Sequence, residues 1–157
     1  MNTFVFARVL HVLAIVFWIG GVAMVTMVIL PYLKSAEKVS LRRMVVFRSI
    51  EKRFSFPVKI SLFITLLSGL YMMEALNYWN VFFEPENWWL QSMAWLWIVF
   101  AIILFVVEPF LLKRIIGPPM RQNSERIFRL IMVAHWFLLI LSTMVIGSAV
   151  AGSHGWI

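Results

Sequence analysis

The chain has 157 residues, of which 62% are hydrophobic and only 13% charged, against about 45–50% and about 25% in an average soluble domain. A soluble domain of this length could not bury so many apolar side chains in one core, so we expect the protein to lie in a lipid bilayer. The composition excludes a soluble globular enzyme, a disordered chain and a nucleic-acid-binding module, although the formal net charge is +7. The absence of cysteine excludes disulfides, thiolate ligands and iron–sulfur clusters.

Four apolar stretches are each long enough to cross about 30 Å of hydrocarbon, which takes roughly 20 helical residues. They cover residues 4–32, 56–78, 88–112 and 127–151. Their apolar runs are unbroken rather than alternating, which favours helices over the strands of a membrane barrel. The sequence therefore predicts a single membrane domain over residues 1–157, an all-α integral membrane protein built as an antiparallel four-helix transmembrane bundle.

Charge in the loops predicts the orientation of this bundle. Twelve of the fourteen Lys and Arg residues lie in or beside the loops that follow the first and third spans, whereas the middle loop carries only Glu84 and Glu86 as charged residues. Because basic loops stay in the cytoplasm, both termini are expected on the outer, periplasmic side of a bacterial inner membrane. Within the first basic loop, residues 44–54 have the composition of a short amphipathic helix lying on the inner surface.

Ionisable side chains inside spans are costly in lipid, so each is a candidate functional group. His11 lies in the outer part of the first span, with Arg8 one turn away and Trp18 seven residues further on the same helix face. Histidine is the usual axial ligand of b-type haem in helix bundles, and arginine can pair with a haem propionate. A thioether is a suitable second ligand for haem iron and also binds Cu(I). The methionines at a matching depth on other spans are Met72, Met73 and Met144.

Structural roles are the alternative for the same residues. His11 could simply hydrogen-bond a carbonyl or hydroxyl of a neighbouring helix, and Arg8 could extend to the outer headgroups. Methionine fills gaps in membrane cores as readily as it binds metal.

A second group of ionisable residues lies toward the inner side, namely Lys59, Glu108 and His135. This group is expected to form a proton path or to contact a quinone head, or to pair internally, with Glu108 bound to His135 or to Lys59. The heights of His11 and His135 should differ by on the order of 10–15 Å, which argues against one haem held by both histidines.

The segment from Leu10-His11 to Trp18-Ile19-Gly20-Gly21 resembles the first helix of two related membrane families, the copper-resistance D family and the oxygen-independent membrane protoporphyrinogen oxidases. The stretch Glu51-Lys52-Arg53-Phe54, with Ser68-Gly69-Leu70 further on, is similar to the Glu-x-Arg segment of the oxidases. The resemblance covers about the first half of the chain. It implies a four-helix membrane fold and, for the oxidase branch, b-type haem with His11 as a ligand. The third span departs from the oxidase pattern, because Trp89-Leu90 is followed by Gln91 where that family has histidine.

Three functions are therefore expected as alternatives. The first is a b-type haem protein that transfers electrons, for example between a quinol and a redox partner at the outer face. The second is a copper-handling permease or accessory protein that uses His11 and methionines for Cu(I). The third is a cofactor-free small subunit of a larger membrane complex. The expected partners are membrane lipid, quinone or a membrane redox protein, and further copies of this chain or other subunits.

Overall fold

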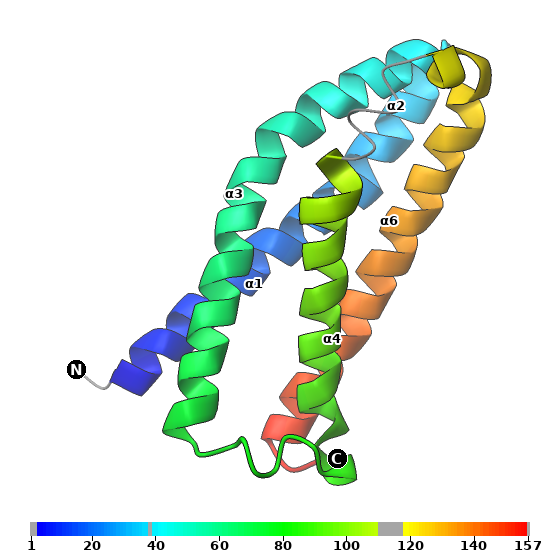
Figure 1. Cartoon of the computed structure of the whole chain (residues 1–157). Coiled ribbons are helices and arrows are strands. Elements are labelled where there is room, and N and C mark those ends of the chain that lie inside the picture. Colours follow the sequence, from blue (N-terminus) through cyan, green and yellow to red (C-terminus); the bar gives the residue numbers. More distant parts are fainter. Residues whose placement is uncertain (1–2, 38, 110–117, 157) are drawn as a thin grey trace.

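The computed structural model describes residues 3–37, 39–109 and 118–156, and this part of the chain is all-α (Figure 1). Four of its helical segments are long and apolar enough to cross a membrane, which confirms the predicted all-α class and the four candidate spans. They are Thr3–Ala36, Leu41–Ala75, Pro85–Val107 and Ser124–Ser153.

The first and third of these segments each contain a short π-helical stretch, a wide turn with i→i+5 hydrogen bonds. The first consists of α1 (Thr3–Met24), η1 (Val25–Ile29, π-helical) and α2 (Leu30–Ala36). The second is the single helix α3 (Ser40–Ala75). The third consists of η2 (Pro85–Asn87, 3-10), α4 (Trp88–Ile102) and η3 (Ile103–Val107, π-helical). The fourth is α6 (Pro118–Ser153).

Helix α3 begins well before the apolar stretch predicted at residues 56–78. The predicted amphipathic segment 44–54 is helical, but it is continuous with the span instead of forming a separate surface helix. Tertiary packing explains the difference, since Met44 and Phe47 are buried against Leu30 of α2 and Phe128 of α6. The 36 residues of α3 rise about 54 Å, well beyond the roughly 30 Å of a hydrocarbon core.

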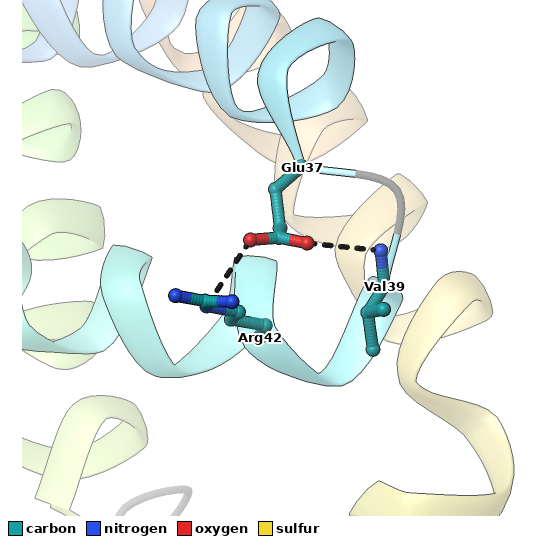
Figure 2. Close-up of polar contacts among 3 residues, drawn as sticks. All are labelled: Glu37, Val39 and Arg42. Atoms are coloured by element: carbon teal, nitrogen blue, oxygen red, sulfur yellow. Dashed lines mark hydrogen bonds and ion pairs between the residues drawn. The ribbon is translucent and has the colours of Figure 1, made fainter.

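A carboxylate fixes the tight connection between α2 and α3. One oxygen of Glu37 accepts a hydrogen bond from the backbone N–H of Val39 at 3.2 Å, and the other lies 3.2 Å from the Arg42 guanidinium (Figure 2). A negative charge next to the first turn of a helix is favourable, because the unpaired N–H groups there carry partial positive charge. Glu37 therefore links the end of one helix to the start of the next.

Two apolar clusters hold the helices together. The larger joins all four segments through buried residues, namely Trp18, Ile19, Val58, Leu62, Leu96, Phe100, Leu138 and Val145. The smaller lies where α2 and the N-terminal ends of α3 and α6 meet, and consists of Leu30, Leu33, Met44, Phe47 and Phe128. Helix α1 packs mainly against α3, whereas α6 packs against both α4 and α3 (Figure 1).

The outward-facing surfaces of these helices are apolar. Large side chains are exposed on every long segment, for example Leu13, Val16, Phe56, Leu67, Trp95, Val133 and Phe137. Contiguous apolar surface of this extent is unfavourable in water and favourable in lipid. The burial pattern therefore agrees with a multi-pass membrane protein.

Candidate functional site

The half-buried His11 of α1 is anchored to α3 through one ring nitrogen. Its Nδ1 lies 3.0 Å from the backbone oxygen of Thr65 and 3.0 Å from the hydroxyl oxygen of Ser68. The Ser68 hydroxyl donates to carbonyls of its own helix, at Ile64 and Thr65, so its oxygen acts as an acceptor toward His11. Both neighbours of Nδ1 are thus acceptors, and this assigns the proton to Nδ1.

The other nitrogen of His11, Nε2, consequently carries a lone pair in the neutral ring. Within the described ranges, no side chain or backbone group forms a hydrogen bond to it. The ring can lie this close to α3 because Gly69 has no side chain: a Cβ there would be 3.2 Å from Cε1 of His11. Thr65, Ser68 and Gly69 of α3 therefore hold the imidazole ring of His11 in place and leave its Nε2 free.

The other residues predicted around His11 differ in exposure. Arg8 is exposed, and Met72 and Met73 are half-buried on α3. Met144 is 68% exposed on α6, so it points away from the bundle interior. Depth along a span can be read from sequence, but the rotation of the helix cannot, and this rotation turns Met144 outward.

The inner group is assembled around one carboxylate. Lys59 Nζ lies 3.1 Å from Oε2 of Glu108, and the Ser55 hydroxyl donates to the same oxygen at 2.8 Å. The Glu108 side chain is only 9% exposed. The sequence left either His135 or Lys59 as the partner of Glu108, and in the structure the partner is Lys59. Glu51 lies one turn before Ser55 on α3 and interacts electrostatically with both members of the ion pair.

His135 of α6 belongs to the same region without touching Glu108 through a hydrogen bond. Its Nδ1 lies 2.9 Å from the backbone oxygen of Ile131, and its ring meets Phe47 of α3 edge-on at 5.9 Å between centroids. His11 contacts α3 at Thr65, 18 residues beyond Phe47. Eighteen residues rise about 27 Å, more than the 10–15 Å expected from sequence, so the two histidines serve different sites.

A cavity of about 120 Å³ lies between the helices at the level of His135. The residues that line it include Glu51, Ser55, His135 and Trp18. The Trp18 side chain is 3% exposed, and its indole N–H is buried without an acceptor among the described residues. The apolar lining includes residues of both π-helical stretches, namely Val25, Ile103 and Leu104.

Sequence reasoning assigned Trp18 to the neighbourhood of His11 and did not select Glu51 or Ser55. The structure puts all three at the inner cavity. The signal for the last two was available, because Glu51, Ser55 and Lys59 recur every four residues and so share one helix face. The pattern crosses a predicted boundary, because Glu51 and Ser55 precede the apolar stretch 56–78 and Lys59 lies within it.

Comparisons with known proteins give one partial similarity. The chain is 37% identical over 62 residues to an uncharacterized protein of Aquifex aeolicus (strain VF5), a match that covers 39% of this chain and 41% of that protein. No family model matches the sequence. No solved structure matches it either. Within the ranges that the structure describes, no three His, Asp or Glu side chains gather as a metal-binding group.

Proposed function

We propose that this protein is a b-type haem protein of the bacterial inner membrane that transfers electrons, with His11 as an axial ligand of the iron. The observation that carries the proposal is the state of the imidazole: Nδ1 is fixed by Thr65 and Ser68, and Nε2 is free. Histidines that ligate metals characteristically donate their second N–H to a carbonyl or carboxylate, which fixes the tautomer and aims the free nitrogen.

Other residues of the chain have defined roles in this proposal. Arg8 is exposed one turn closer to the N-terminal end of α1, where its guanidinium can pair with a haem propionate. Met72 and Met73, half-buried on α3, are the proposed sources of a second ligand. When bound, haem would supply one-electron redox chemistry, and the chain would supply the ligand, the counter-charge and an apolar surrounding.

We further infer that the four spans run antiparallel, with the basic loops in the cytoplasm and both termini outside. The loop charges support this orientation, since the two loops rich in Lys and Arg lie on one side in an alternating arrangement. His11 then lies in the outer half of the membrane, and the Lys59–Glu108 pair lies toward the cytoplasm.

An absorption spectrum of the purified protein tests the haem assignment. We expect a Soret band that is lost in His11→Ala and retained in His135→Ala. The two histidines contact α3 at Thr65 and Phe47, points that are about 27 Å apart along that helix. A His11→Gly variant should regain the band when imidazole is added, which separates loss of a ligand from loss of folding. Bound copper without a Soret band would favour copper handling, and neither group in the wild-type protein would favour the cofactor-free subunit.

A further inference from the structure

The inner cavity has the size and the walls of a site for one aromatic ring. Its volume of about 120 Å³ is close to that of the roughly 150 Å³ apolar cavities known to hold benzene. Aromatic side chains from α1, α3 and α4 line it, namely Trp18, Phe47, Phe54 and Phe100. Lining that is mostly apolar and carries a few polar groups is typical of small-molecule sites. Water, by contrast, needs two to four polar partners for each molecule.

The polar groups at this cavity offer both a donor and acceptors. The indole N–H of Trp18 is a buried donor that lacks an acceptor. His135 commits Nδ1 to the Ile131 carbonyl, so in the neutral ring its Nε2 is an acceptor. The carboxylate of Glu51 also lines the cavity and has no hydrogen-bond donor among the described residues. A buried donor without a partner costs free energy, which a ligand oxygen would recover.

We propose that this cavity binds the ring of a membrane-dissolved quinol. A quinol hydroxyl both accepts and donates, so one oxygen can accept from Trp18 while the other donates to His135 or Glu51. A quinone only accepts and satisfies only the tryptophan. The ligand therefore matches the site in size, aromatic walls and hydrogen-bonding pattern.

The depth of the cavity suits a ligand that is dissolved in the bilayer. Ser55 lies 20 residues from Ala75, the last residue of α3, a rise of about 30 Å. If Ala75 lies at one boundary of the hydrocarbon, Ser55 lies close to the other. A polar ring on an apolar tail is at its most stable near such a boundary. The inference deepens the proposed function by naming an electron donor, but the binding itself does not require haem.

The direct test is binding of a decyl-tailed benzoquinol to the purified full chain in detergent, measured by anaerobic equilibrium dialysis. Trp18→Phe keeps an aromatic side chain but removes the indole N–H together with the pyrrole ring, and it should weaken binding about fivefold or more. The matched control is Trp97→Phe, because the Trp97 N–H donates to the Leu62 carbonyl and does not line the cavity. Glu51→Gln should also weaken binding, and the corresponding decyl benzoquinone should bind more weakly than the quinol.

Several outcomes would overturn the proposal. Absence of saturable binding would mean that the cavity holds water only. Equal effects of Trp18→Phe and Trp97→Phe would place the ligand elsewhere, and equal affinity for quinol and quinone would refute the donor–acceptor assignment. The haem proposal is judged separately, because His11→Ala should abolish the Soret band while leaving quinol binding unchanged.

Discussion

Replacing Lys59 with methionine should destabilise the protein far more than replacing its partner Glu108 with glutamine. The two side chains form an ion pair at 3.1 Å, but their surroundings differ: Glu108 is 9% exposed and Lys59 is 29% exposed. Lys59→Met leaves a carboxylate in the interior with only the Ser55 hydroxyl as a donor. Glu108→Gln keeps an acceptor for Ser55 and leaves an ammonium whose flexible stem can reach a more polar region.

The difference in destabilisation between Lys59→Met and Glu108→Gln follows from the cost of an uncompensated buried charge. Removing one partner of a buried pair typically costs about 3–5 kcal/mol, and the remaining Ser55 bond places Lys59→Met at about 3 kcal/mol. Leaving a partly exposed charge without its partner costs about 1 kcal/mol, the range expected for Glu108→Gln, which leaves the Lys59 ammonium unpaired. The double variant has no stranded charge, so it should cost about 1–2 kcal/mol, well below the sum of the single variants.

Unfolding in mixed micelles with increasing SDS, followed by far-ultraviolet circular dichroism, measures all three free energies on one scale. The reasoning is refuted if Lys59→Met is as mild as Glu108→Gln. It is also refuted if the double variant equals the sum within about 0.5 kcal/mol, because the two residues would then be energetically independent.

Two further predictions concern packing and orientation. A Cβ at Gly152 would lie 2.5 Å from the Trp89 ring, whereas one at Gly147 would meet nothing within 4 Å; in the same unfolding assay Gly152→Ala should cost about 1–3 kcal/mol, and Gly147→Ala should be neutral or stabilising. Because the chain has no cysteine of its own, single cysteines report orientation cleanly. In intact cells a cysteine at the exposed Asn80 should react with an impermeant thiol reagent and one at the exposed Ser35 should not, and the reverse pattern would invert the proposed orientation.

Hydropathy predicted the helical class and the existence of four apolar spans, because lipid imposes one simple requirement on every spanning segment. It did not predict where α3 begins. The charges at Arg42 and Arg43 suggested a loop, but Met44 and Phe47 are buried in the smaller cluster, and Arg43 pairs with Glu125 at 2.9 Å. Tertiary contacts with α2 and α6 thus extend the helix over a sequence that composition alone assigns to a surface connection.

Site residues were predictable to the extent that they depend on chemistry, but not where they depend on helix rotation. His11 stood out because an imidazole in a span is rare. The outward rotation of Met144 is set by packing between helices, which no local pattern in this chain reveals. Glu51, by contrast, shares a helix face with Ser55 and Lys59 at four-residue spacing. Trp18 was predicted on the face of His11, whereas in the structure it lines the inner cavity.

The π-helical stretch η1 changes the phase of the buried face along the first span. Before that stretch, the buried positions include 7, 14, 18 and 21, with the three- and four-residue steps and multiples expected of one α-helical face. Within it the buried position is 26, and after it the buried positions are 30 and 33. The five-residue step from 21 to 26 ends inside η1 and is one residue longer than an α-helical step, as expected where a wide turn adds a residue. Deleting one residue from η1 would turn α2 by about 100° relative to α1 and carry Leu30 and Leu33 out of the smaller cluster. Length variation in this span is therefore tightly limited, even though every residue of η1 except Thr26 is apolar.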